Sequence, residues 1–373
     1  MRTLPLHSGG KLHLKGLSRP ELEALVSSWG EPSYRATQLF QWLYAKRATD
    51  FAAMTNLPRS LRQRLAEECT LETLRLERTQ RSEHDGTVKL LFRLPDGAAV
   101  ESVLIPSEEA HSQRRRLTLC VSTQVGCPLG CAFCATASLR LRRNLNAAEI
   151  VDQLLQAQRL SSQRITNLVF MGMGEPLLNF EAVLTAVRIW TDPVAELLSP
   201  RRITLSTAGL VPEIYRLADS GIRIKLAISL HSVDQQLREQ LMPIARRYPL
   251  SELQEAARYY AHQTHRPVTY EYILFDRLND TPADADAVAR FVKKSAAAKV
   301  NLIPFHPIDF VGPTGLAAQL RPSPPERIHA FQERLRRHGV LAFLRSSSGI
   351  DINAACGQLA FAWEASPREL SSA

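Results

Sequence analysis

Three cysteines lie close together in the stretch 127–134, which reads Cys-Pro-Leu-Gly-Cys-Ala-Phe-Cys. Cys127, Cys131 and Cys134 are half of the 6 cysteines in this chain of 373 residues. Thiolates bind soft metals, and a short loop can wrap three of them around one corner of an inorganic cluster. Because no fourth cysteine follows closely, such a loop leaves one iron without a protein ligand, open to a substrate or cofactor.

Two other interpretations of the three cysteines are possible. Their spacing also fits one stripe of a helix, on which free cysteine packs as a small hydrophobe. Gly126, Pro128 and Gly130 argue for a loop, because glycine and proline are poor residues for a helix interior. A structural zinc site needs four closed ligands, and the available fourth candidate is Cys120, upstream of the loop.

The C-x3-C-x2-C pattern of this loop resembles the cluster motif of radical S-adenosylmethionine enzymes. The resemblance implies a [4Fe-4S] cluster on Cys127, Cys131 and Cys134, whose open iron chelates the amino and carboxylate groups of S-adenosyl-L-methionine. Electron transfer then cleaves the sulfonium and releases a 5'-deoxyadenosyl radical, which requires an electron donor such as flavodoxin or ferredoxin. The pattern does not identify the substrate, because this superfamily's chemistries are many.

The elements that must position this loop follow Arg116, where strands and helices alternate. Strands are expected at 117–122, 165–171, 202–207, 223–230, 268–275 and 299–305. Helices are expected at 147–160, 180–190, 211–220, 234–242, 251–262 and 282–295. This order predicts an α/β fold with a parallel sheet curled into a partial (β/α)6 barrel of the TIM type, in which ligands bind at the C-terminal strand ends.

Further motifs fall at those expected strand ends. In Gly-Met-Gly-Glu-Pro at 172–176, glycines let the backbone approach a ligand and a carboxylate can hold an ammonium group, although a tight turn explains the bare pattern equally well. Behind a three-cysteine loop, the motif resembles the family's site for the amino group of S-adenosylmethionine. The resemblance implies that the following residues contact the cofactor: Gly174, Glu175, Ser206, Ser229, Leu230 and His231.

Two segments precede the barrel. Residues 18–69 show a helical pattern that Pro32 and Pro58 divide into three helices, and they resemble the small N-terminal domain of adenine-C2 RNA methyltransferases of the RlmN type. Residues 87–106 alternate around Pro95-Asp96-Gly97, which predicts a β-hairpin. Within it, Glu101 matches the proton-accepting glutamate of that family.

A last motif, Ala-Ala-Cys-Gly-Gln-Leu at 354–359, contains Cys356. By itself Cys356 would be a buried structural thiol. The resemblance implies instead a nucleophilic cysteine on a mobile loop. One S-adenosylmethionine molecule methylates this cysteine. The radical made from a second S-adenosylmethionine molecule then takes a hydrogen atom from that methyl group. The methylene radical adds to adenine, Glu101 deprotonates the attacked carbon, and Cys120 closes a disulfide that releases the product.

The charge of the chain favours a polyanionic partner. Lys and Arg number 46 against 37 Asp and Glu, which gives a net charge of +9. Between positions 111 and 148 no acidic residue occurs, and arginines that could position an RNA by its phosphates flank the cluster loop at 114–116, 140, 142 and 143. Without a long apolar run or a signal sequence, and with cysteines clustered as ligands, the chain is expected in the cytoplasm, without membrane contact.

These expectations combine into a domain plan and a function. The plan is an N-terminal helical RNA-binding accessory domain at 1–80, a hairpin extension at 81–110, a radical S-adenosylmethionine methyltransferase core at 111–363 and a polar tail at 364–373, in a monomer. By resemblance, the enzyme methylates C2 of an adenine in 23S rRNA, in tRNA at the adenosine following the anticodon, or in both.

Three alternatives stay open. They are methylation at C8, as in the relatives resembling Cfr, a radical enzyme acting on a small molecule, and a non-catalytic iron–sulfur or zinc RNA-binding protein. One departure is visible, because His306 stands where the family usually has an asparagine that touches the cofactor.

Overall fold

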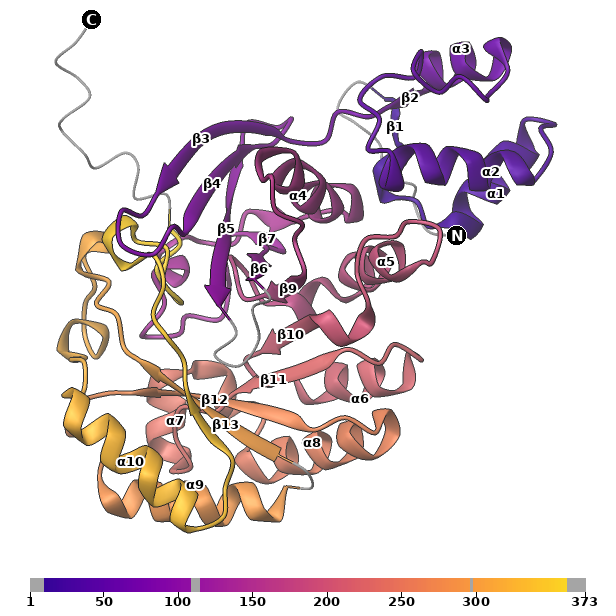
Figure 1. Ribbon diagram of the computed structural model, residues 1–373. Helices are drawn as coiled ribbons and strands as arrows, with labels where there is room; N and C mark the ends of the chain where they lie inside the picture. The colour runs from indigo at the N-terminus through magenta and orange to yellow at the C-terminus, as the bar shows by residue number, and fades with distance from the viewer. Residues whose placement is uncertain (1–9, 109–114, 296–297, 361–373) are drawn as a thin grey trace, which may run out of the picture.

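A ten-stranded sheet in the order β14-β13-β12-β11-β10-β9-β6-β5-β4-β3 organises the computed structural model, which describes residues 10–108, 115–295 and 298–360. From β6 to β14 neighbouring strands run parallel, and they curl into a partial barrel with helices on its outer face (Figure 1). The parallel strands are β6 (Arg115–Cys120), β9 (Asn167–Phe170), β10 (Ile203–Thr207), β11 (Lys225–Ser229), β12 (Val268–Leu274), β13 (Ala298–Pro304) and β14 (Ala342–Leu344).

The helices of the barrel alternate with these strands, as the sequence predicts. They are α4 (Ala147–Leu160), α5 (Phe180–Thr191), α6 (Val211–Asp219), α7 (Gln235–Leu241), α8 (Leu250–Thr264), α9 (Pro282–Lys294) and α10 (Pro325–Arg337). The predicted partial barrel and its six strands are confirmed. The sequence interpretation missed α10 and β14, because α10 buries only a narrow apolar stripe among charged residues and β14 has three residues with Phe343 exposed.

The predicted hairpin forms between β4 (Val88–Arg93) and β5 (Ala99–Glu108), with Leu91 opposite Glu101. Strand β5 also pairs with β6, so the hairpin continues the barrel sheet instead of standing apart. The edge strand β3 (Arg75–Arg81) was not expected, because its sequence is polar at almost every position. A short, charged, exposed edge is how proteins prevent pairing with other chains.

Three helices form the N-terminal segment, as predicted, and they project from the barrel (Figure 1). They are α1 (Arg19–Ser28), α2 (Tyr34–Phe40), which continues as a π-helical turn (Gln41–Ala45), and α3 (Arg59–Glu68), and the short strands β1 (Leu12–His13) and β2 (Cys69–Thr70) pair beside them. Ser18 and Glu21 form the capping box that starts α1. A buried ion pair joins this segment to α4, with Lys15 Nζ 2.7 Å from Asp152 Oδ1.

Part of the sequence analysis lies outside the described residues, namely Arg114 and the tail 364–373. Across the ranges 10–108, 115–295 and 298–360, no helix is long and apolar enough to cross a membrane.

Candidate active site

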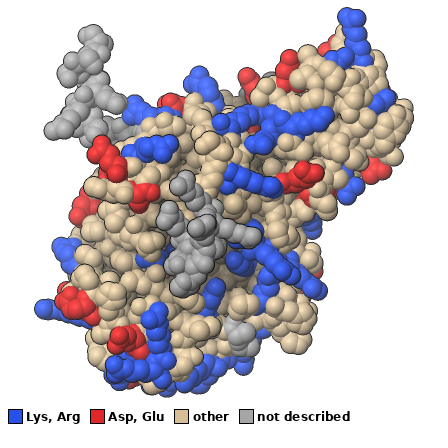
Figure 2. Space-filling model, in the orientation of Figure 1, with Lys and Arg blue, Asp and Glu red and all other residues tan. Residues whose placement is uncertain are grey.

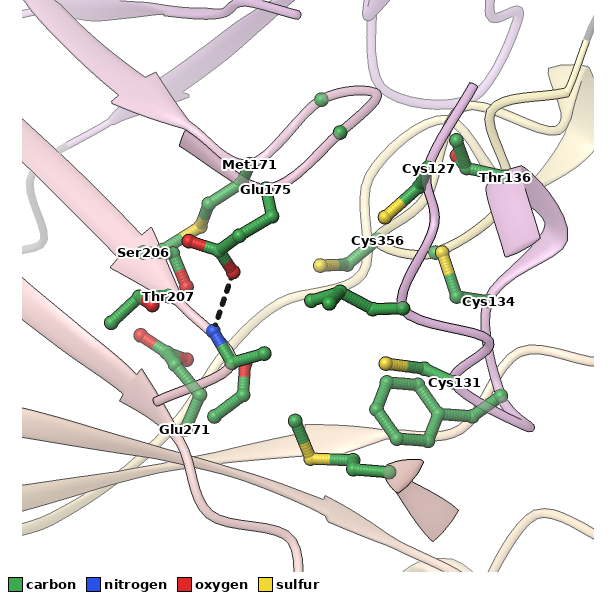
Figure 3. A pocket seen from close by; sticks show the side chains of 18 of the residues that line it. Cys127, Cys131, Cys134, Thr136, Met171, Glu175, Ser206, Thr207, Glu271 and Cys356 are labelled. Atoms are coloured by element: carbon green, nitrogen blue, oxygen red, sulfur yellow. Dashed lines mark hydrogen bonds between the residues drawn. The ribbon is translucent and has the colours of Figure 1, made fainter. Parts of the chain in front are cut away.

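A cavity lies at the C-terminal ends of the parallel strands, as the barrel architecture predicts. Cys127, Cys131 and Cys134 form one side of it, and Glu175, Ser206 and Glu271 lie on the other (Figure 3). In this view, the thiol of Cys356 lies between the two sides. The geometry thus brings the predicted metal ligands, cofactor contacts and one reactive thiol to a single cavity.

The three cysteines lie on a loop, which excludes the helical stripe. The paired strands β7 (Gln124–Val125) and β8 (Arg143–Asn144) hold both ends of the segment, and Cys127 N donates to Leu139 O at 3.2 Å. Gly126 adopts a φ of +79°, and a Cβ there would collide with Arg140 O. Glycine is therefore required where the loop begins.

The three thiols fit an iron–sulfur cluster better than a zinc ion. In the described part of the chain, no three His, Cys, Asp or Glu side chains are grouped to hold a single metal ion. The fourth zinc ligand suggested by the sequence, Cys120, lines a different cavity. Burial raises the pKa of all three loop thiols, that of Cys127 to about 12, so these thiols give up protons when iron binds.

Glu175 is buried on the opposite side of the cavity. Its Oε2 accepts a hydrogen bond from Ala208 N at 2.7 Å, and its Oε1 accepts one from Leu177 N at 3.0 Å. Burial nevertheless raises its pKa to about 7. A carboxylate held in this way gains from a nearby cation, which fits the ammonium group of an amino acid.

Gly174 brings the backbone next to Glu175 close to β7. It has a φ of +96°, and an added Cβ would lie 2.5 Å from Gln124 Cβ. Gly174 therefore occupies a close contact with β7 that admits no side chain.

The other predicted cofactor residues divide into two groups. Ser206, Ser229 and His231 line the cavity. Leu230 is fully buried and is not among the lining residues, so its side chain does not belong to this site. Burial lowers the pKa of His231 to about 3, and its Nδ1 accepts from Ile273 N at 3.0 Å, so the ring is neutral with its proton on Nε2.

A second cavity of about 1180 Å³ adjoins the first, and Cys356, Met171, Ile303, Arg345 and Leu359 line both. Cys120 lines this second cavity, which brings the two reactive cysteines of the sequence analysis to one space. His306 also lines it, and not the cofactor cavity that the sequence comparison suggested for this position.

The thiol of Cys356 influences that of Cys120. Burial and, to a lesser extent, the neighbouring Cys356 raise the pKa of Cys120 to about 12. Burial also raises the pKa of Cys356, although this residue is exposed to the cavities. Arg345 opposes both shifts, because its positive charge favours the thiolates. Its Nη1 lies 3.6 Å from Glu271 Oε2.

The loop that carries Cys356 is attached to the cysteine loop. Ala135 N donates to Gly357 O at 2.7 Å, and Thr136 Oγ1 donates to Leu359 O at 2.6 Å. These two bonds place Cys356 between the cluster ligands and Cys120.

Glu101 occupies a different environment from the other predicted catalytic residues. It is fully buried, does not line either cavity, and has its Oε1 3.6 Å from Lys89 Nζ. Because side chains alternate along β5, Glu101 shares a face with Val103, which lines the second cavity. The structure therefore places Glu101 beside the site and inside the sheet.

Several residues of the site were missed by the sequence analysis. Arg345 follows the unexpected strand β14, Glu271 lies within β12, and Lys89 lies within β4. For Glu271 and Lys89 a signal existed, because a charged residue inside an otherwise apolar strand is rarely buried without a partner or a role.

The arginines beside the cysteine loop have different surroundings. Arg140 and Arg142 are exposed, whereas Arg143 forms ion pairs with Asp96 and Glu149. Arg116 lines the second cavity. On the face shown in Figure 2, Lys and Arg side chains also gather where the N-terminal helices meet the strands of the hairpin.

Two family models match the chain. Residues 12–71 match the ribosomal RNA large subunit methyltransferase N-terminal domain, and residues 121–291 match the radical SAM superfamily. The first match covers the three N-terminal helices, and the second covers the cysteine loop and most of the barrel.

Whole-chain relatives agree with these matches. The probable dual-specificity RNA methyltransferase RlmN of Symbiobacterium thermophilum is 47% identical over 352 residues, which covers 94% of this chain and 91% of the relative. The dual-specificity RNA methyltransferase RlmN of Sorangium cellulosum is 43% identical, with 96% of each chain covered. A crystal structure of a radical SAM methyltransferase from Sphaerobacter thermophilus superimposes with a TM-score of 0.84 at 43% identity, covering 95% of this chain and 99% of that one.

Proposed function

Because the chain belongs to the RlmN family of radical S-adenosylmethionine RNA methyltransferases, we propose that it methylates C2 of an adenine in RNA through an S-methylcysteine at Cys356. Its cofactors are a [4Fe-4S] cluster and S-adenosyl-L-methionine. The observation that supports the proposal most directly is the position of Cys356, which lines both the cofactor cavity and the cavity that contains Cys120.

In this proposal the residues of the first cavity bind the cofactors. Cys127, Cys131 and Cys134 hold the cluster, while Glu175 receives the ammonium group of S-adenosylmethionine and Gly174 lines the same cavity. Ser206, Ser229 and His231 line the remainder of the cofactor site, to which Leu230 contributes backbone alone. When bound, these cofactors supply the methyl group and the radical chemistry that activates it.

The residues in and beside the second cavity handle the transferred carbon. Cys356 carries it on its sulfur, and Glu101, which lies beside the cavity, accepts the proton from the attacked ring carbon. The unpaired electron that the addition leaves on the ring would return to the cluster, which supplied it. The thiolate of Cys120 then attacks the sulfur of Cys356. A disulfide forms while the bond from that sulfur to the transferred carbon breaks, and the electron pair stays with the carbon, which gains a proton to complete the methyl group.

The RNA is proposed to be 23S rRNA, tRNA, or both, consistent with the dual specificity in the relatives' names. Residues 1–80 act as its accessory binding domain and 81–110 as the hairpin extension of a core at 111–363. Exposed Arg140 and Arg142 contact phosphates. We place this monomer in the cytoplasm, with a flavodoxin or ferredoxin as electron donor.

The test is an anaerobic assay of the reconstituted enzyme with S-adenosylmethionine, reductant and RNA that lacks the modification. The RNA is digested and its methyladenosine isomers are identified by mass spectrometry. We expect 2-methyladenosine, whose position in the RNA names the substrate. The appearance of 8-methyladenosine instead would overturn the assignment to C2, and cofactor cleavage without either isomer would overturn the assignment to adenine.

A further inference from the structure

Lys89 is buried near the start of β4, between the apolar residues Val88 and Leu90. Its side chain is 2% exposed, that of Glu101 is 0% exposed, and Lys89 Nζ lies 3.6 Å from Glu101 Oε1. Taking two charges out of water is costly, and apolar side chains in their place often give an equal or more stable fold. The pair therefore calls for a reason beyond packing.

The register of the sheet places this pair beside the second cavity. Val103 of β5 is the cross-strand partner of Lys89 on one side and of Cys120 on the other. Directly paired residues point to the same face of a sheet, so these three side chains form one row. Glu101 is the next residue on that face, and Val103 and Cys120 line the second cavity. The buried pair thus lies within a residue or two of a reactive thiol.

We propose that Lys89 is the positioning residue that holds the carboxyl group of Glu101 in the orientation needed for its proton transfer, an inference that rests on the proposed role of Glu101 as the base. The ammonium group of Lys89 lies 3.6 Å from Glu101 Oε1 inside the sheet, and a misplaced catalytic group transfers protons more slowly. In the step served by Lys89, a Glu101 oxygen takes the proton from the attacked ring carbon and the electron pair of that C–H bond stays in the ring. Lys89 keeps its own proton throughout.

The electrostatics of Lys89 agree with this role. Burial lowers the pKa of its ammonium group, and the neighbouring Glu101 raises it. The neighbouring carboxyl group therefore favours the ammonium form of Lys89, which is the form that can hold it in place.

A purely structural role would be to tie β4 to β5. These strands already pair over six registered positions, from Val88 and Leu104 to Arg93 and Ala99. Such a ladder does not depend on a buried ion pair for its register. The pair therefore fits the chemistry of the neighbouring cavity better than the stability of the hairpin.

The experiment compares Lys89→Met, Lys89→Arg and Glu101→Gln in the full-length, cluster-reconstituted enzyme with RNA. Two quantities are measured, methylated RNA by mass spectrometry and covalent protein–RNA adduct by denaturing electrophoresis. For Lys89→Met we expect product formation to fall by roughly tenfold or more, because the proposed base loses the group that orients it. The adduct should accumulate at the same time, and Lys89→Arg, which keeps the charge, should restore turnover.

A matched control is Lys15→Met, which breaks a second buried lysine pair whose residues line neither of the two cavities. A general loss of stability would affect both methionine variants, whereas adduct should accumulate in Lys89→Met alone. One outcome overturns the role of Lys89 and leaves the proposed function intact. In that outcome Lys89→Met forms product without accumulating adduct, whereas Glu101→Gln accumulates adduct. If Glu101→Gln itself turns over normally, the proposed base is wrong, and the role of Lys89 with it.

Should Lys89→Met fail to fold, the double variant Lys89→Met with Glu101→Gln decides the matter. A folded double variant shows that breaking the contact between Lys89 and Glu101, and not the loss of packing by the lysine side chain, caused the failure, which supports the proposal. Failure of both variants assigns Lys89 to packing and overturns it.

Discussion

The thiols of Cys356 and Cys120 face one cavity, and Cys356 also faces the cavity lined by the three cysteines of the loop. Cys134 is close enough to Cys356 to raise its pKa, as Cys356 raises that of Cys120. A carbon bound to Cys356 would thus lie between the cavity of the three loop cysteines and the cavity that contains Cys120. This relationship suggests different consequences for the loss of each thiol.

Cys356→Ala is expected to abolish RNA methylation and adduct formation, because no other thiol faces both cavities among the described residues. Iron content and visible absorbance should stay at the level of the unmodified protein, since the three loop cysteines are unchanged. Cys120→Ala should instead accumulate adduct, because the carbon is transferred and cannot be released. Normal turnover by Cys356→Ala would contradict a mechanism through this cysteine.

Binding of S-adenosylmethionine should weaken as the pH falls below about 7, the raised pKa of buried Glu175. The ammonium group binds the ionised carboxylate, so affinity should fall by about tenfold for each pH unit below that value. Calorimetric titrations of the reconstituted enzyme with S-adenosylmethionine measure this affinity between about pH 6 and 8, which is roughly one pH unit on each side of the Glu175 pKa. Glu175→Gln should bind weakly at every pH, and an identical pH slope in that variant would assign the dependence to another group.

Glu175 also affects the stability of the cofactor-free protein. Its folded-state pKa of about 7 exceeds the ordinary value of 4.5, so the folded chain holds this proton more tightly than the unfolded chain. Stability is therefore lost as the pH rises from 4.5 to about 7 and is not regained above it. Thermal denaturation of the wild type and Glu175→Gln across this interval should show a smaller loss in the variant.

Gly174→Ala should disturb the cofactor site more than an ordinary glycine substitution does. Both a φ of +96° and a contact of 2.5 Å with Gln124 Cβ oppose an added methyl group. Gly221 is a matched control, because its φ is +76° and nothing lies within 4 Å of the added atom. Gly221→Ala should cost about 1 kcal/mol of folding free energy, and Gly174→Ala clearly more, with weaker binding of S-adenosylmethionine. Equal denaturation midpoints for the two variants would argue against the close contact.

The sequence was sufficient for the barrel and for the cofactor cavity, because these depend on local patterns. Apolar runs that alternate with amphipathic helices show where the strands end. Motifs at those ends predicted Cys127, Glu175 and Ser206 as site residues, and all three line the first cavity. The side chain of Leu230 turns into the core, which the motif does not show, and its contact with the cofactor stays a prediction.

Contacts between distant segments could not be derived in this way. Arg345 and Glu271 are 74 positions apart in the sequence. They meet because β14 and β12 both pair with β13. Their contact therefore depends on the register of β14, a strand that the sequence analysis missed. The burial of Glu101 against Lys89 likewise depends on which face of the hairpin turns inward. Such pairs follow from the assembled sheet, and no single segment contains the information.

Lys15→Met should destabilise the protein by about 3–5 kcal/mol, because it leaves the carboxylate of Asp152 buried without its ammonium partner. The matched control is Arg19→Met, which breaks an ion pair at the same junction, between α1 and Asp192, where Arg19 is 42% exposed. That loss should be about 1 kcal/mol or less. Chemical denaturation measures both, and similar values for the two variants would contradict the importance of burial for the Lys15 pair.

Arg345→Met should slow the methylation of Cys356 at neutral pH. The guanidinium lowers the pKa of the Cys356 and Cys120 thiols against the effect of burial, so its removal leaves both more fully protonated. The rate should recover as the pH is raised, because the higher thiol pKa is then exceeded. Mass spectrometry of the peptide with Cys356, after incubation of the reconstituted enzyme with S-adenosylmethionine, follows the reaction. Arg345→Lys keeps a positive charge between the cavities and should retain most of the rate at neutral pH, whereas equal slowing in both variants would assign Arg345 a role in packing.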